Sequence, residues 1–201
     1  FADPAHAARI ASAFFDEMLR HGTTTSVAYC SSHPGSAEAY FAEAAARNMR
    51  VIGGKVMMDR NAPEALCDTA QRSYDETKAL IGKWHGKCRA EVAITPRFAI
   101  TSSPDQLAAA GALAQAFPDC PVQTHLSENH DEIASTLALY PAARDYLDIY
   151  ETYGLLGRRS LMGHAIHLNP REIAVMAETG TVAVFCPTSN LFLGSGLYNE
   201  A

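Results

Sequence analysis

Two histidines and a glutamate are the residues of this sequence best suited to chemistry. His125 lies near the end of one short apolar run, His164 lies near the end of another, and Glu128 follows the first histidine by three positions. Imidazole is the commonest metal ligand among protein side chains and suits zinc. A carboxylate beside it could carry protons in metal-assisted hydrolysis. The pattern predicts part of a hydrolytic metal site, because these three residues are too few to close one.

Each of these residues also has a simpler interpretation when taken alone. A single histidine in an apolar run is more often a hydrogen-bonded core residue than a ligand. Glu128 alone would fit the first turn of a helix, where the helix dipole favours a negative charge. Two histidines on successive predicted strands, with a carboxylate close to one of them, favour the metal site.

Arg97 and Phe98 follow a third apolar run, in the segment Thr-Pro-Arg-Phe. The arginine could hydrogen-bond a carbonyl or ring nitrogen of a planar substrate while Phe98 packs on its ring. A surface arginine beside a core phenylalanine is the alternative, and these residues alone leave both open. Residues 186–190 are expected to line the mouth of the site. We do not expect Cys186 to be a nucleophile, because no base is tied to it by local sequence.

The elements that must position these side chains are six apolar, β-branched runs that alternate with amphipathic segments. Regular alternation without hairpin turns predicts an α/β protein with a parallel sheet and helical crossovers. The predicted strands are residues 23–30, 50–57, 89–95, 121–126, 160–165 and 181–186. Two apolar stripes at helical spacing predict helices, one through Ile10, Phe14 and Met18 and one through Leu66, Ala70, Tyr74, Thr77, Ile81 and Trp84.

Two further helices have clear starting signals. Ser103 before Pro104, and Asn169 before Pro170, each place a capping side chain ahead of a proline in the first helical position. Gly180 is expected to end the second of these helices, because glycine readily adopts the left-handed conformation found there.

The choice of architecture lies between an open doubly wound sheet and a (β/α)8 barrel. No glycine-rich phosphate loop opens any of the helices, which argues against a nucleotide-binding sheet. Histidines at the carboxyl ends of two successive strands fit a TIM-type barrel, whose active sites gather there. A barrel needs eight strands and typically about 250 residues. We therefore interpret residues 1–201 as the central part of a single hydrolase barrel domain, with about six of its βα units.

Composition excludes several classes of partner. The net charge is −6 and the 16 basic residues are scattered, so neither nucleic acid nor an anionic membrane surface is an expected partner. The longest apolar runs are far shorter than a bilayer span. Five cysteines without a CxxC pair indicate reduced thiols in a cytoplasmic protein.

Taken together, the motifs resemble those of guanine deaminases, which are zinc enzymes of the amidohydrolase superfamily. The resemblance covers essentially the whole chain, and its Thr-Pro-Arg-Phe and Lys-Val-Met-Met-Asp segments are the more specific ones. The segments that carry it are Gly22-Thr23-Thr24-Thr25, Gly54-Lys55-Val56-Met57-Met58-Asp59, Thr95-Pro96-Arg97-Phe98, Thr124-His125-Leu126-Ser127-Glu128, His164 and Cys186-Pro187-Thr188-Ser189-Asn190-Leu191.

This resemblance implies a role for each candidate residue. His125 and His164 would bind one Zn²⁺, with iron as the alternative metal. Glu128 would relay a proton, and Arg97 and Phe98, together with His125 and Glu128, would bind guanine. The implied reaction is hydrolytic deamination of guanine to xanthine and ammonia in purine catabolism, by a cytoplasmic homodimer.

The sequence also departs from the family pattern. The family's His-x-His pair on the first strand, its aspartate on the last strand and its flanking small β-domain are not found in these residues. We therefore expect this polypeptide alone to be incomplete and inactive. Two alternatives remain: a related deaminase acting on cytosine, a triazine or an adenosine derivative, and a non-catalytic fragment or scaffold.

Overall fold

Parallel strands alternate with helices along the whole described part of the chain. The computed structural model describes residues 1–198. Its strands are β1 (Thr25–Tyr29), β2 (Arg50–Gly54), β3 (Val56–Met57), β4 (Ala90–Val92), β5 (Thr95–Pro96), β6 (Val122–Leu126), β7 (Ser160–His164) and β8 (Val182–Val184). These strands match the six predicted runs, except that β5 extends one residue beyond the predicted end at Thr95. Two of the runs each form two strands, β2 with β3 and β4 with β5. The α/β prediction is confirmed.

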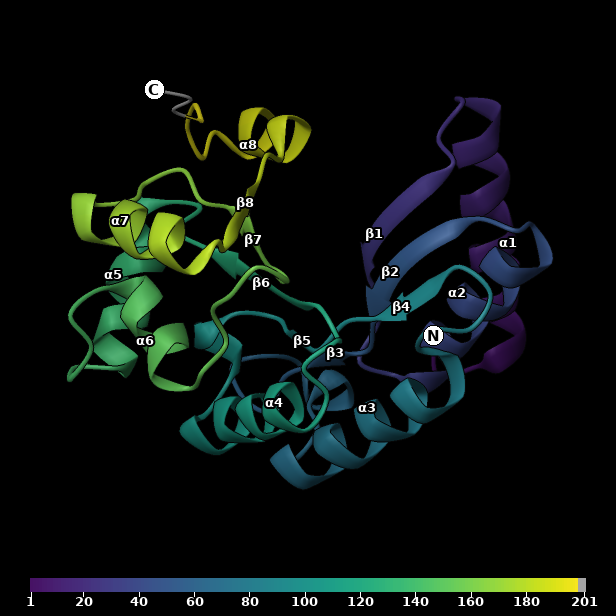
Figure 1. The fold of residues 1–201 in the computed structure, drawn as a ribbon, viewed down its shortest axis with the longest axis horizontal. Helices are drawn as coiled ribbons and strands as arrows, with labels where there is room; N and C mark the ends of the chain where they lie inside the picture. Colours follow the sequence, from purple (N-terminus) through teal and green to yellow (C-terminus); the bar gives the residue numbers. More distant parts are fainter. Residues whose placement is uncertain (199–201) are drawn as a thin grey trace.

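The strands pair in parallel and in chain order. β1 pairs with β2 and β2 with β4, β3 pairs with β5, and β6 pairs with β7, which pairs with β8. A single bridge between Ile94 and Val122 joins the first strands to β6, and the backbone N–H of Gln123 donates to Ile94 O at 2.9 Å. Six strand positions therefore follow one another around a curved array, with helices on its outer side (Figure 1).

Two helices, α4 and α7, begin where local sequence signals predict, and α7 also ends where predicted. The α-helices are α1 (Pro4–Arg20), α2 (Pro34–Ala46), α3 (Ala70–Trp84), α4 (Pro104–Ala116), α5 (His130–Leu139), α6 (Tyr146–Thr152), α7 (Pro170–Thr179) and α8 (Pro187–Leu193), with short 3-10 turns η1 (Glu64–Leu66) and η2 (Ala99–Thr101). The side chains of Ser103 and Asn169 cap α4 and α7 as predicted. Gly180 ends α7 with a φ of 72°, in the left-handed conformation.

Two details of the helix prediction are wrong. The buried residues of α1 are Ala7, Ala11 and Phe15, whereas Ile10 and Phe14 are exposed and border an apolar groove beside β1. The second stripe begins too early, because Leu66 belongs to the separate turn η1 and α3 starts at Ala70. Thr69 caps α3 by accepting a hydrogen bond from the N–H of Arg72, which fixes that start.

A buried cluster of charged side chains lies at the break between β2 and β3. Lys55, the residue between these strands, is fully buried and its Nζ lies 3.2 Å from a carboxylate oxygen of Glu76. It also pairs with Asp68, whose side chain is almost fully buried. A buried ammonium group needs such partners. Lys55 therefore ties the end of the β2 run to α3 and the segment before it.

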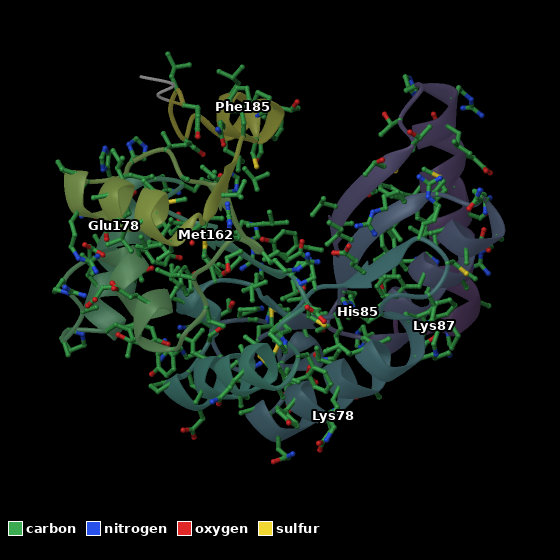
Figure 2. All side chains as sticks on the ribbon, viewed as in Figure 1. Lys78, His85, Lys87, Met162, Glu178 and Phe185 are labelled. Atoms are coloured by element: carbon green, nitrogen blue, oxygen red, sulfur yellow. The ribbon has the colours of Figure 1, made fainter. Side chains whose placement is uncertain are left out.

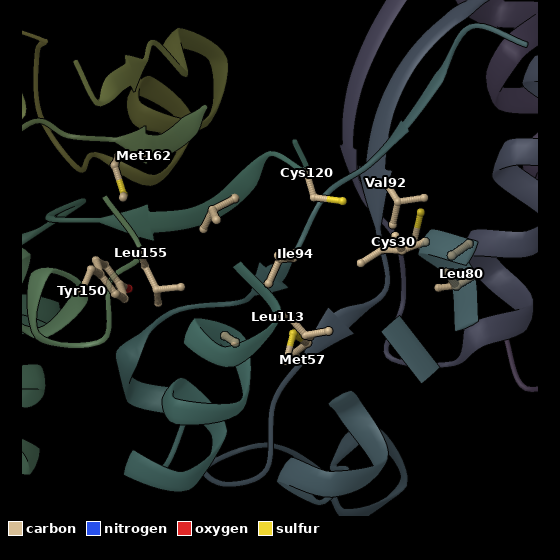
Figure 3. Close-up of a cluster of buried hydrophobic side chains, with 14 of the residues drawn as sticks. Cys30, Met57, Leu80, Val92, Ile94, Leu113, Cys120, Tyr150, Leu155 and Met162 are labelled. Atoms are coloured by element: carbon tan, nitrogen blue, oxygen red, sulfur yellow. The ribbon is translucent and has the colours of Figure 1, made fainter. Parts of the chain in front are cut away.

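The hydrophobic core lies between the outer face of the strands and the helices. Met57, Ile94, Leu113 and Met162 are fully buried members of one cluster that extends along the array (Figure 3). The charged side chains of Lys78, Lys87 and Glu178 lie on the helical exterior (Figure 2). This core fixes the strands whose carboxyl ends carry the candidate site.

The two ends of the array lie far apart in Figure 1. No backbone pairing joins β1 to β8 within residues 1–198. Val27 in β1 and Val182 in β8 are exposed, as is Phe185 just beyond β8 (Figure 2). Among the described helices, none has the length and apolar character needed to cross a membrane.

Candidate metal-binding active site

The predicted site residues meet where three neighbouring strands end. His125 is the fourth residue of β6, His164 is the last residue of β7, and Arg97 and Phe98 directly follow β5. The register pairs Leu126 of β6 with His164, so both histidines lie at the same edge of the sheet. Their ring centroids are 5.3 Å apart. The carboxyl ends of parallel strands thus bring these side chains together, as predicted.

The imidazole of His125 is oriented by the main chain of Arg97. The backbone N–H of His125 donates to Arg97 O at 3.1 Å, and Nδ1 of the ring lies 2.8 Å from the same oxygen. A carbonyl oxygen can only accept, so Nδ1 carries the proton in the neutral ring and Nε2 keeps its lone pair. The ring also packs against Tyr29, with centroids 4.7 Å apart.

His164 is held in a similar way by a side chain from α8. Its Nδ1 lies 2.8 Å from Oδ1 of the buried Asn190, which leaves Nε2 as the free ring nitrogen. His164 and Ala165 have φ values of 68° and 48°, a left-handed conformation that costs free energy in residues other than glycine. The backbone N–H of Ala165 donates to Leu126 O at 2.9 Å and fixes this turn.

Glu128 reaches the free nitrogen of His164. Its Oε2 lies 3.5 Å from Nε2 of His164, and its Oε1 accepts a hydrogen bond of 2.9 Å from Oγ of Ser195. The backbone N–H of Glu128 donates to the carboxylate of Glu132, which also belongs to the capping box that starts α5. The first turn of α5 therefore fixes the backbone from which Glu128 reaches the site.

Arg97 and Phe98 lie beside the histidines. The Arg97 guanidinium lies 4.4 Å from the centroid of the Phe98 ring, and this ring lies 6.0 Å from that of His125. The Arg97 side chain is exposed, while its backbone N–H donates to Met57 O at 3.1 Å. The side chain is therefore free to contact a ligand, while the main chain supports His125.

Burial keeps the His125 ring neutral. Desolvation lowers the pKa of His125 to about 4, although the hydrogen bond to Arg97 O acts in the opposite direction. The neighbouring His164 and Arg97 lower it further. A neutral imidazole with a free Nε2 is the form that binds metal ions.

The two histidine nitrogens suit zinc as two of the ligands that a complete zinc site would need. Both histidines have Nδ1 engaged and Nε2 open, which is the arrangement that outer hydrogen bonds impose on metal-ligating histidines. A catalytic zinc usually has three protein ligands. Within residues 1–198 no three His, Cys, Asp or Glu side chains form a group that could hold a metal ion.

Three polar residues of the site were not predicted from the sequence. Asn190 lies in the segment predicted as a loop at the mouth of the site, which instead forms the helix α8, and nothing in the sequence links it to His164. Ser195 follows α8 and reaches Glu128. Tyr150 hydrogen-bonds the main chain of His125 from α6, and an amphipathic pattern gives no signal for such a contact.

The sequence matches the Amidohydrolase family over residues 2–199, and the chain belongs to this family. It is 52% identical to guanine deaminase of Escherichia coli K12 over 193 residues, which are 96% of this chain and 44% of that protein. It is 45% identical to a probable guanine deaminase of Deinococcus radiodurans, over 98% of this chain and 45% of that protein. The chain thus spans less than half the length of these relatives.

Solved structures show the same arrangement of elements. Guanine deaminase of E. coli has a TM-score of 0.97 at 49% identity, covering 98% of this chain and 46% of that one. A guanine deaminase of C. acetobutylicum with bound guanine in its active site has a TM-score of 0.93 at 31% identity, covering 98% and 48%. A triazine hydrolase from an Arthrobacter species has a TM-score of 0.87 at 19% identity, covering 97% and 45%, and shares the fold. The prediction of a partial TIM-type barrel is confirmed.

Proposed function

We propose that the protein containing this chain is a guanine deaminase, which hydrolyses guanine to xanthine and ammonia. The observation that carries the proposal is the approach of Glu128 to within 3.5 Å of the free nitrogen of His164, next to the open Nε2 of His125. Relatives named guanine deaminase that align with nearly the whole chain support the choice of substrate. The residues would form the central part of a single hydrolase barrel.

His125 and His164 would hold one zinc ion through Nε2, with further ligands from groups outside residues 1–198. When bound there, zinc would supply a Lewis acid that makes water reactive near neutral pH. Iron is the alternative metal, because it also accepts imidazole and carboxylate ligands. We further expect a cytoplasmic homodimer.

Glu128 would move the protons of the reaction. Its carboxylate would take a proton from the attacking water as a bond forms to guanine C2, and would give it to a ring nitrogen. It would then take the second proton of that water from the new C2 hydroxyl and give it to the departing amine as the C2–N bond breaks, so that one water is consumed and one ammonia released. Ser195 holds Oε1 of this carboxylate, which leaves Oε2 facing His164 and the reaction centre.

Arg97 and Phe98 would select and orient the purine. The guanidinium can donate to the guanine carbonyl or an adjacent ring nitrogen, and Phe98 can pack against the ring. Cytosine and adenine lack this combination of a purine ring and a carbonyl. The Arg97–Phe98 pair therefore favours guanine over the other aminated rings.

Ammonia release tests the proposal directly. We would supply guanine, cytosine or adenine to the full-length, zinc-loaded protein and measure ammonia with each. Release from guanine alone is the expected result. Release only from another base would overturn the substrate assignment. A protein that binds no stoichiometric zinc and gains no thermal stability from it would instead be the non-catalytic scaffold.

A further inference from the structure

Tyr150 lies beneath the candidate site and its hydroxyl is fully engaged. The residue is part of α6 and is completely buried, next to Leu155 and Met162 in the core (Figure 3). The hydroxyl donates to the backbone oxygen of His125 at 2.8 Å and accepts from the backbone N–H of Ala99 at 3.1 Å. A phenol has one proton and two lone pairs, so one acceptor site remains.

Thr124 occupies the remaining side of this hydroxyl. Its Oγ1 lies 3.1 Å from the Tyr150 oxygen and 3.2 Å from Arg97 O, and its single proton is donated to one of these two acceptors at a time. Arg97 O is also the oxygen that accepts from both the backbone and the ring of His125. The strand end that carries His125 and the segment 97–99 therefore share one hydrogen-bond network, with Tyr150 at its centre.

The helix that carries Tyr150 is itself fixed in place. Asp145 caps α6 and forms an ion pair with Arg171 of α7 at 2.8 Å. The backbone N–H of Leu147 donates to the buried carboxylate of Glu172 at 3.1 Å. Because α6 is anchored to α7 in this way, the position of the Tyr150 hydroxyl is fixed. This hydroxyl can therefore hold the end of β6 and the segment 97–99 in place.

We propose that Tyr150 is a positioning residue, which holds the zinc ligand His125 and the guanine-binding segment 97–99 in register with each other. Its hydroxyl acts through the backbone oxygen of His125 and the backbone nitrogen of Ala99. The claim about guanine binding rests on the proposed function. The claim about zinc affinity requires only that His125 binds the metal.

Replacing Tyr150 by phenylalanine removes the hydroxyl and preserves the ring. In the full-length protein, Tyr150→Phe should raise the zinc dissociation constant about tenfold, measured by competition with a chelator, as for other outer partners of metal ligands. It should also raise KM for guanine about fivefold, the effect of one lost hydrogen bond. Its kcat, measured at saturating zinc and guanine, should change less than KM.

Tyr40→Phe is the matched control. The Tyr40 hydroxyl is also buried and lies 3.4 Å from Ser26 O and 3.3 Å from Ile52 O, in the strands β1 and β2. Its removal should lower thermal stability without changing zinc affinity or KM. A purely structural role of Tyr150 would give the same result in both variants, and that outcome would overturn the proposal.

Two further measurements keep the proposal testable if Tyr150→Phe does not fold or if the protein does not deaminate guanine. If Tyr150→Phe does not fold, Thr124→Val removes a hydroxyl of the same network and should raise the zinc dissociation constant and KM by about threefold each; no change in either would contradict the proposal. If the wild-type protein releases no ammonia from guanine, the proposed function fails. The ratio of zinc dissociation constants between Tyr150→Phe and wild type would still decide whether Tyr150 positions His125.

Discussion

Ser195 donates a hydrogen bond of 2.9 Å to Oε1 of Glu128, across 67 residues of the chain. Ser195 is itself held on both sides, since its backbone N–H donates to Asn190 O and its carbonyl oxygen lies 2.8 Å from Nε2 of His167. The segment after α8 thus reaches back over the end of β6. One oxygen of the proposed proton relay is fixed, while the other remains directed at His164.

Removal of the Ser195 hydroxyl should slow the reaction. Ser195→Ala frees Oε1 of Glu128, so that the carboxylate samples orientations that do not face His164. A hydrogen bond to a charged group contributes about 1.5–3 kcal/mol, and only the part specific to the transition state affects kcat. We expect kcat for guanine to fall about tenfold with little change in KM. Ser195→Thr keeps the hydroxyl and should restore most of the rate.

Glu128→Gln should have a larger effect on the chemistry. The amide keeps an acceptor for Ser195 but cannot take a proton from water. General acid–base groups contribute about 10²–10⁴-fold to rate, so kcat for guanine should fall by about this factor. Zinc content, measured by elemental analysis, should stay at the wild-type value because both histidines remain. A kcat within fivefold of wild type would remove the proposed relay role.

Arg97→Ala separates substrate binding from metal binding. The main-chain oxygen of Arg97 accepts the hydrogen bond from the His125 ring, and alanine retains this oxygen. Zinc content should therefore be unchanged, while kcat/KM for guanine falls about 10- to 100-fold through loss of a charge-assisted hydrogen bond. Arg97→Lys should recover only part of the loss, since an ammonium group cannot form the paired hydrogen bonds of a guanidinium. Equal turnover in wild type and Arg97→Ala would contradict the assignment.

Much of the fold could be predicted because its signals are local. Ser103 and Asn169 each cap a helix within three residues, and Gly180 adopts the conformation that ends α7. The convergence of His125 and His164 was also predictable, because parallel strands place their carboxyl ends at one edge of the sheet.

The remaining features depend on contacts between distant residues. Asn190 is 26 residues from His164 in the sequence, and Tyr150 is 25 residues from His125. The buried ion pairs of Lys55 with Asp68 and Glu76 likewise join separate elements of the chain. Such pairs follow from how helices pack on strands, which apolar periodicity does not specify.

Asn190→Ala should weaken metal binding without removing a ligand. Asn190 holds Nδ1 of His164 and so directs Nε2 of that ring. Loss of such an outer partner typically lowers metal affinity about 10- to 100-fold. We expect that increase in the zinc dissociation constant, measured by chelator competition. Asn61→Ala is a matched control, because Asn61 is exposed and its amide donates to Ile100 O of η2 rather than to either histidine. Unchanged zinc affinity in Asn190→Ala would show that the backbone turn at His164 orients this ring without the hydrogen bond from Asn190.

Acid should destabilise the metal-free protein through His125. Its pKa is about 4 in the folded protein against 6.5 for an unperturbed histidine, so the unfolded state binds more protons between these values. The free energy of unfolding therefore falls as the pH is lowered from 6.5 to 4, and this contribution is constant above 6.5. At about 1.4 kcal/mol per pH unit, the loss is at most about 3.5 kcal/mol.

Urea unfolding of metal-free wild type and His125→Gln at several pH values would measure this contribution. Other groups titrate alike in both proteins, so the difference between their free energies of unfolding isolates residue 125. Because glutamine does not titrate, wild type should lose stability relative to the variant as the pH falls from 6.5 to 4. A difference that stays constant over this range would mean that His125 is protonated as easily in the folded protein as in the unfolded chain. The ring would then be open to water, and the burial that keeps Nε2 available for a metal would be absent.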